Sequence, residues 1–323
     1  MTSTAVRPPA TPPAAGPAAP RTRVRRARGG REERVAGYVF VAPFFVVFGV
    51  FGLFPMVFTL WVSLHEWNLL GEHTWTGVAN YGELATDPYF WNALRNTLGI
   101  FVIATVPQLC VALGIAQVLN QKLRGRTLWR MGVLLPNVTS IAAVGIIFTL
   151  IFARDFGLAN WLLGYVGLDP VGWQDHRWSS WLAISVMVDW RWTGYNALIF
   201  LAALQAVPRD LYEAAVVDGA SAWRQFTNVT VPMLKPTLVF VTLVSTIGGI
   251  QLFTEPLIFN SGANAITGGT TRQFQTLTMY LYERAFTGQE FGYASSVAWV
   301  MFLVIAAAGI LNVLLLRRLK GVS

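Results

Sequence analysis

The chain has 323 residues, of which 54% are hydrophobic and only 12% are charged. Soluble proteins carry about 25% charged residues, and a single soluble core stops growing near about 250–300 residues. This much apolar surface therefore indicates burial in lipid and argues against a soluble enzyme, a fibrous protein and a globally disordered chain. The single Cys110 excludes a disulfide scaffold. The net charge of +8 suits either nucleic acid or a membrane surface.

The first 34 residues differ from the rest of the chain. Pro, Ala and Thr dominate up to Pro20, and an Arg-rich run follows to Arg34. Such a segment cannot bury enough surface to fold. We predict a disordered cytoplasmic tail that sets orientation and touches anionic lipid. Nucleic-acid binding is disfavoured, because no aromatic residues lie among the arginines to stack on bases.

Residues 35–323 are predicted to form one all-α membrane domain. A bilayer core of about 30 Å takes about 20 helical residues, and six segments are long and apolar enough. The fourth of them is interrupted by Asp189 and Arg191. The predicted spans are residues 37–62, 96–119, 132–153, 181–205, 236–258 and 293–316.

The distribution of Lys and Arg predicts the orientation of these spans. If the N-terminus is cytoplasmic, 18 of the 24 lie in inside segments and six lie elsewhere. Because inside loops are enriched in Lys and Arg, both termini are predicted to be cytoplasmic. Residues 206–235 then form the longest inside loop.

No sequence pattern for catalysis or nucleotide binding is present. The chain lacks G-x-x-x-x-G-K-[ST], HExxH and paired CxxC motifs, and its three histidines all lie outside the predicted spans. We therefore expect no catalysis, metal or cofactor in this chain. If it moves a solute, the energy comes from a gradient or from another subunit.

The 206–235 loop has the pattern of two short helices joined by a turn. Gly219 suits the reversal, because only Gly takes positive φ without penalty, and Ser221 is a suitable N-cap for the second helix. Pro232 and Pro236 are predicted to stop that helix before the fifth span. An apolar stripe on the second helix fits either a partner protein or the chain's own span ends and lipid headgroups. The stripe consists of Trp223, Phe226 and Val229.

This loop resembles the EAA loop of membrane permeases in ATP-driven, binding-protein-dependent importers. The matching positions are Glu213, Ala214, Ala215, Asp218, Gly219, Ala220, Val229, Val231 and Pro232, with Val where the family usually has Ile and Leu. The resemblance implies that the hairpin docks on an ATP-hydrolysing subunit and passes motion to the spans. The predicted coupling residues are Glu213, Ala214, Ala215, Asp218, Gly219, Ala220, Phe226, Val229 and Pro232.

Other segments resemble the sugar-permease branch of that family. They include Asn80-Tyr81, Leu135-Pro136 and Gly292-Tyr293-Ala294. The resemblance implies a carbohydrate substrate, a second homologous permease, two ATP-binding subunits that carry ATP-Mg, and an extracytoplasmic solute-binding protein. It also implies a multi-pass protein of a prokaryotic plasma membrane.

Polar residues inside the predicted spans are candidates for the substrate path. An intramembrane charge costs about 2.5–3.5 kcal/mol at the bilayer centre. Asp189 and Arg191 are two residues apart and point to different faces, so each is expected to meet another helix, a partner subunit or water. Glu255 lies near a span end, where its side chain can also reach the interface. A role in hydrogen bonding between spans or to the partner permease is an equally weighted alternative to lining the path. The candidates for the path are Asp189, Arg191, Trp192, Tyr195, Asn196, Ser245, Gln251 and Glu255.

A second hypothesis is a gradient-driven secondary transporter that uses Asp189 and Glu255. The hairpin separates the two hypotheses, because a gradient-driven carrier has no use for a loop that docks on an ATPase.

Overall fold

The computed structural model describes residues 32–68, 73–260 and 262–318. Within these ranges almost all of the regular structure is helical. The chain divides into two units, Met1–Pro55 and Met56–Ser323.

In the first unit, helix α1 (Glu32–Phe48) is followed by a π-helical segment, η1 (Gly49–Leu53). Nearly all of the described side chains are apolar and exposed; Tyr38, for example, is 77% exposed. A helix that is hydrophobic all round requires an apolar environment, as expected for the first predicted span. The predicted tail, residues 1–34, lies outside the described residues except for Glu32–Arg34, which begin α1.

The second unit holds the other helices and one small sheet. Strands β1 (His65–Glu66) and β2 (Thr74–Trp75) pair antiparallel, with His65 opposite Trp75; the sequence did not predict them. The helices before the hairpin are α2 (Phe54–Ser63, which begins in the first unit), α3 (Ala79–Thr86), α4 (Pro88–Leu119), α5 (Arg126–Val138), α6 (Ile141–Ile151), α7 (Leu158–Tyr165) and α8 (Arg177–Gln205). The later helices are α9 (Arg209–Val217), α10 (Ala222–Gln225), η2 (Phe226–Thr230), α11 (Val231–Ile250), α12 (Thr254–Phe259), α13 (Leu277–Tyr282), η3 (Glu283–Thr287) and α14 (Phe291–Arg318).

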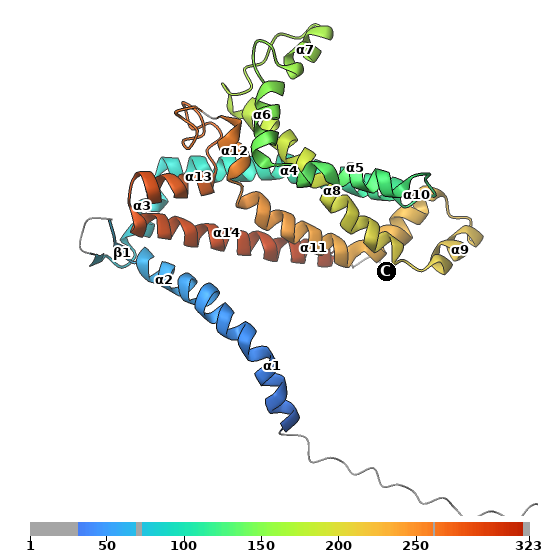
Figure 1. Cartoon of the computed structure of the whole chain (residues 1–323), viewed down its shortest axis with the longest axis horizontal. Helices are drawn as coiled ribbons and strands as arrows, with labels where there is room; N and C mark the ends of the chain where they lie inside the picture. The colour runs from blue at the N-terminus through green and yellow to red at the C-terminus, as the bar shows by residue number, and fades with distance from the viewer. Residues whose placement is uncertain (1–31, 69–72, 261, 319–323) are drawn as a thin grey trace, which may run out of the picture. The chain divides into compact units, whose positions relative to one another are not determined.

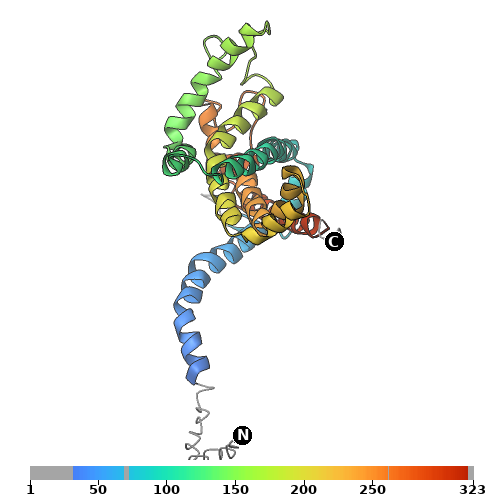
Figure 2. The same ribbon diagram turned by 90° about the vertical axis from the view of Figure 1, so that its right-hand side faces the viewer.

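Four long helices form the bundle of this unit. α4 packs along α8, and α11 packs against α14, α4 and α8 (Figures 1 and 2). The α11–α14 contact includes a hydrogen bond from Asn312 Nδ2 to Thr246 Oγ1 at 2.8 Å. Helix pairs in lipid gain stability from such interhelical hydrogen bonds.

The third predicted span, residues 132–153, is bent. α5 and α6 meet at 88° across a break at Thr139 and Ser140 (Figures 1 and 2). Thr139 takes an extended backbone conformation, and its hydroxyl donates to the Leu135 carbonyl at 2.8 Å. Such local bonds compete with continuation of the helix. The sequence predicted one span here and gave no sign of the bend, since hydropathy does not detect a change in the direction of a helix.

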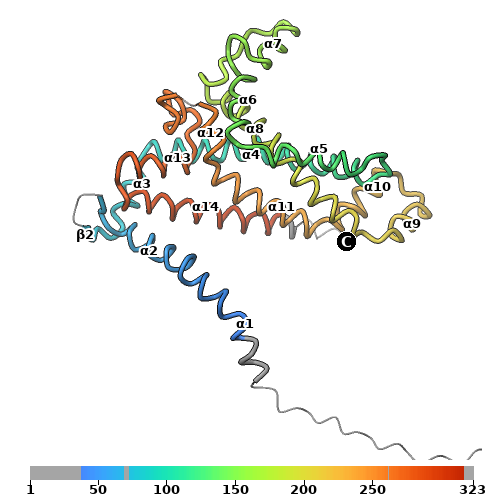
Figure 3. The backbone as a smooth tube through the Cα atoms, viewed as in Figure 1, coloured from blue at the N-terminus to red at the C-terminus, as the bar shows by residue number. Residues whose placement is uncertain are grey.

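The fifth predicted span, residues 236–258, is interrupted. α11 ends at Ile250, and α12 starts only at Thr254 (Figure 3). Phe253, between them, has φ −130° and ψ −56°, outside the helical range. The break redirects the chain so that α12 packs on α6 and α8.

The second hairpin helix does not stop at its prolines. α10 continues through η2 into α11, giving one helix from Ala222 to Ile250. Pro232 lies in the first turn of α11, directly after the π-helical segment, and Pro236 lies inside the helix. The prediction that Pro232 and Pro236 end the helix was wrong, because altered hydrogen bonding around a π-helical segment accommodates the missing N–H groups.

Four described helices are long and apolar enough to cross a membrane, and the bent pair α5–α6 makes up to five. α8 has 29 residues but is not among them, because its polar residues, including Asp189 and Arg191, lower its hydropathy. The structure thus confirms a helical membrane protein, while the sixth span and the orientation stay predictions. The single helices that qualify are Tyr38–Ser63, Pro88–Leu119, Ala222–Ile250 and Phe291–Leu315.

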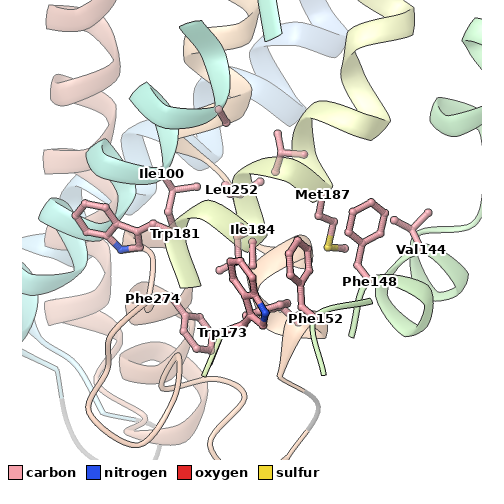
Figure 4. Packing of buried hydrophobic residues seen from close by; sticks show 14 residues of the cluster. Ile100, Val144, Phe148, Phe152, Trp173, Trp181, Ile184, Met187, Leu252 and Phe274 are labelled. Atoms are coloured by element: carbon pink, nitrogen blue, oxygen red, sulfur yellow. The ribbon is translucent and has the colours of Figure 1, made fainter. Parts of the chain in front are cut away.

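A cluster of buried apolar side chains joins α4, α6, α8 and α12. Ile184 and Met187 of α8 are fully buried there, and Phe148 of α6 and Phe152, the residue after α6, pack around them (Figure 4). In Figure 4, Met187 faces Phe148. This cluster fixes α12 against α8 and therefore fixes the position of any side chain on the first turn of α12.

Glycine allows the closest approach between α5 and α8. A Cβ built on the buried Gly194 would lie 1.7 Å from the backbone oxygen of Val133. Small residues of this kind let membrane helices pack backbone to backbone.

We expect Gly194→Ala to lower the apparent melting temperature of the purified protein. Forcing a methyl group into a closed contact costs about 1–3 kcal/mol. Gly132→Ala on α5 is the matched control, because nothing lies within 4 Å of its Cβ position and Ala favours the helix. Equal melting temperatures for the two variants would contradict the close α5–α8 contact.

A charged cluster ties the loop before α13 to η3. The Arg272 guanidinium makes two hydrogen bonds to the Glu283 carboxylate, at 2.6 and 2.8 Å. Gln275 Nε2 donates a third at 2.7 Å. The Arg272 carbonyl in turn accepts from Asn92 and Asn96 of α4. Burial alone would raise the pKa of Glu283, but the hydrogen bonds and charge of Arg272 lower it on balance.

This cluster predicts a loss of stability in acid. A carboxyl group whose folded pKa is lowered from 4.5 contributes stability above that value and loses it as the pH falls through the folded pKa. We expect the melting temperature of wild type to fall more steeply below about pH 4.5 than that of Glu283→Gln, measured by differential scanning fluorimetry from pH 7 to 3. Identical pH profiles would show that Glu283 does not carry this contribution.

Candidate functional site

A cavity of about 350 Å³ lies between the helices of the bundle. Most of its walls come from α4, α8 and α11, and the residues around the break between α11 and α12 close it. Its charged and polar lining residues are Arg191, Asn196, Ser245, Gln251, Thr254, Glu255, Thr105 and Gln108, and its aromatic ones are Phe101, Trp192, Tyr195 and Phe253.

Three neutral polar side chains meet at one wall of the cavity. Asn196 Nδ2 of α8 lies 3.3 Å from Gln108 Oε1 of α4 and 3.5 Å from Ser245 Oγ of α11. Asn196 and Gln108 are buried. Each helix of the bundle wall therefore contributes a group that can donate or accept a hydrogen bond, and the three groups partly satisfy one another.

Aromatic rings line the cavity beside these groups. The rings of Trp192 and Tyr195 stand edge to face, with centroids 6.0 Å apart. Both side chains remain about 40% exposed in the chain alone. Apolar walls with a few converging polar groups are typical of ligand sites.

An ion pair closes the end of the cavity near α12. Arg191 Nη1 lies 2.5 Å from Glu255 Oε1, and the two side chains are only 12% and 7% exposed. The bond joins α8 to the first turn of α12. Arg191 therefore meets another helix, as predicted, and Glu255 is buried rather than extended to an interface.

Asp189 stands apart from this arrangement. It does not line the cavity, and its Oδ1 atom is buried without a hydrogen-bond partner among the described residues. The other seven residues predicted for the substrate path, Arg191, Trp192, Tyr195, Asn196, Ser245, Gln251 and Glu255, all line it.

Five polar or aromatic residues of the lining were not predicted for the path: Phe101, Thr105, Gln108, Phe253 and Thr254. Gln108 offered a signal, because an amide in the middle of an apolar span needs a partner. The aromatic and hydroxyl residues offered none, since single Phe and Thr residues are ordinary in membrane helices.

The turn of the hairpin has the structure that the sequence predicts. α9 ends at Val217, Gly219 has φ +72°, and the Ser221 hydroxyl accepts from the Arg224 N–H at 3.4 Å. A hydrogen bond between Tyr212 and Thr230, at 3.0 Å, ties α9 to η2. The hairpin is thus a defined structure whose two limbs are held together.

The hairpin exposes several large apolar side chains beside its charged ones. Val217 is 87% exposed and Trp223 71%, and the Trp223 and Phe226 rings stack with centroids 5.7 Å apart. Glu213 is also exposed. Exposed apolar side chains grouped in this way mark contact surfaces. Among the described residues, no group of three His, Cys, Asp or Glu side chains could hold a metal ion.

Residues 108–321 match the protein family described as "Binding-protein-dependent transport system inner membrane component". The chain is 39% identical over 291 residues to the lactose transport system permease protein LacF of Rhizobium radiobacter, covering 88% of this chain and 95% of that protein. It is 34% identical over 290 residues to the arabinooligosaccharides transport system permease protein AraP of Halalkalibacterium halodurans, covering 89% and 90%.

The fold has a solved counterpart. A chain in the crystal structure of a bacterial ABC transporter involved in the import of the acidic polysaccharide alginate superposes with a TM-score of 0.73, at 20% identity, over 89% of this chain and 96% of that one. At this identity the likeness shows the fold alone.

These matches define a class of membrane permease. The chain belongs to the family of binding-protein-dependent transport system inner membrane components. Membership confirms the resemblance carried by the hairpin and favours an importer permease over a gradient-driven carrier.

We expect Ser245→Trp to fill the cavity and to reduce solute uptake at least tenfold while the protein still inserts in the membrane. An indole group is a large part of a 350 Å³ space. Ile247→Trp is the control, because Ile247 is exposed on the same helix and does not line the cavity. Uptake in cells that depend on this permease measures both, and normal uptake with Ser245→Trp would exclude this cavity from the path.

Proposed function

We propose that this chain is one of two permease subunits of an ATP-driven sugar importer and that its cavity forms half of the translocation path. The observation that carries the proposal is the lining of the cavity. Amide and hydroxyl groups of Asn196, Gln108 and Ser245 lie beside the rings of Trp192 and Tyr195. Sugars present hydroxyl groups that need hydrogen-bond partners and C–H faces that stack on aromatic rings.

The comparisons support a sugar as the class of solute. The relatives named above are permeases for lactose and for arabinooligosaccharides, and the chain matches both over nearly their full length. The match to the alginate importer adds support for the fold. No single relative identifies which sugar this chain carries.

The hairpin is proposed to be the coupling element. Its exposed side chains, with Glu213 on α9 and Trp223 on α10, would fill a cleft on an ATP-binding subunit that holds ATP-Mg. The coupling residues are those proposed from the sequence: Glu213, Ala214, Ala215, Asp218, Gly219, Ala220, Phe226, Val229 and Pro232. Because the hairpin continues directly into α11, which lines the cavity, docking can act on the path.

The assembly follows from the family. The complex would contain a second homologous permease, two ATP-binding subunits and an extracytoplasmic solute-binding protein. This chain would cross a prokaryotic plasma membrane six times with both termini in the cytoplasm, the arrangement that the Lys and Arg distribution favours.

The coupling role predicts that Gly219→Asp loses the ATP-binding subunit. The substitution puts a charged side chain into the hairpin turn, where the backbone is at φ +72°. We expect mild-detergent pull-down of the tagged chain to retain the second permease but to recover at least tenfold less ATP-binding subunit, and uptake to fall in parallel. Glu213→Arg tests the facing limb in the same way.

Gly125→Asp is a matched control for this experiment. Gly125 also has φ +72° with nothing within 4 Å of its Cβ position, but it precedes α5, outside the hairpin. It shares the backbone strain and the added charge, so it should keep the ATP-binding subunit. Equal recovery of the ATP-binding subunit with the Gly219→Asp and Gly125→Asp variants would contradict the docking role of the hairpin.

A further inference from the structure

The charged groups of the cavity come as a matched pair. Arg191 and Glu255 are the residues with ionised side chains among its lining, and they bond each other at 2.5 Å. All other polar lining residues are neutral amides and hydroxyls. The part of the path that this chain supplies therefore has no net charge, although it contains a guanidinium that could attract an anion.

Stability of the fold alone does not explain why these two positions carry charged residues. Both side chains are nearly buried, and the desolvation of two charges offsets much of their attraction, so that apolar residues of the same volume often stabilise a fold equally well. A second cluster already fixes α12 on α8 through Met187 and Phe148. The presence of charges at this position is better explained by what they do to a solute.

One polar atom of the ion pair has no hydrogen-bond partner within the described part of the chain. Arg191 Nε is buried and has no hydrogen-bond partner among the described residues. Buried N–H groups are rarely left unpaired. Since Nε itself is buried, the part of Arg191 that lines the cavity and can meet a solute oxygen is the exposed edge of its guanidinium, while the positive charge of the same group is held by Glu255.

We propose that the Arg191–Glu255 pair selects neutral saccharides over saccharides that carry a carboxylate. Arg191 donates a hydrogen bond to a sugar oxygen, and Glu255 neutralises the guanidinium so that an anionic sugar gains nothing from it. This inference rests on the proposed function, since it takes the cavity as the sugar path.

The test uses two probes that differ only at C6, where methyl β-D-galactoside has a neutral hydroxymethyl group and methyl β-D-galacturonide has a carboxylate. The intact purified complex in nanodiscs is titrated with each probe, and saturation-transfer difference NMR gives the two dissociation constants. Wild type should favour the galactoside. Glu255→Gln, which keeps the size of the side chain and removes its charge, should shift the ratio of the two constants at least tenfold toward the galacturonide.

The double variant Arg191→Gln/Glu255→Gln is the matched control. It removes both charges, so the cavity is neutral again, and the preference for the galactoside should return. A Glu255→Gln effect that persisted in the double variant would overturn the proposal, because the effect would then not depend on the guanidinium. Co-purification of the ATP-binding subunit checks that each variant is assembled.

Ser245→Trp separates this inference from the function on which it rests. If the galactoside binds wild type and Ser245→Trp abolishes its signal, the cavity is the sugar site; an unchanged ratio in Glu255→Gln then overturns the charge selection alone. If the galactoside gives no signal that Ser245→Trp removes, the cavity does not bind this sugar and the charge selection is wrong, while the sugar path is judged separately by solute uptake in Ser245→Trp.

Discussion

The structure depends on the pairing of one charged group inside the bundle, the guanidinium of Arg191. Arg191 lies within α8, where an unpaired guanidinium would be strongly unfavourable, and the nearest carboxylate in the chain sequence, Asp189, points elsewhere. Glu255 supplies the partner from the first turn of α12, which packs against α8. The helix that begins with α10 ends at Ile250, and the chain restarts as α12 with Glu255 next to Arg191. The interruption of that helix and the ion pair are thus two aspects of one arrangement.

The same arrangement produces the cavity. The residues of the break, Gln251 to Phe253, form part of the cavity wall together with residues of α4, α8 and α11. The polar groups of Asn196, Gln108 and Ser245 then face the space and not the lipid. Irregular backbone at membrane depth is tolerated where it lines a cavity, and here it also carries functional groups toward that cavity.

Much of this could be predicted from the sequence. Apolar runs located α4, α14 and the first helix, and the spacing around Gly219 and Ser221 gave the hairpin turn. Seven of the eight proposed path residues line one cavity, because polar residues in apolar helices have few places to go. The bend at Thr139 and the break after Ile250 could not be predicted, since hydropathy reports how apolar a segment is and not the direction of its helix axis. The prediction that Pro232 ends the helix failed for a related reason. The effect of this proline depends on the π-helical segment before it, and no residue pattern marks that segment. The pairing of Arg191 with Glu255, and not with Asp189, depends on tertiary structure, because it is set by the packing of α12 against α8.

The continuous helix from Ala222 to Ile250 has a mechanical consequence. At 1.5 Å per residue it is a rod of roughly 40 Å, with Trp223 near one end and the cavity wall near the other. The helix is continuous, but η2 and Pro236 lie between the hairpin and the cavity wall. A push at the hairpin therefore reaches Ser245 through these two irregular places, and the helix itself ends only at the break after Ile250, next to the ion pair.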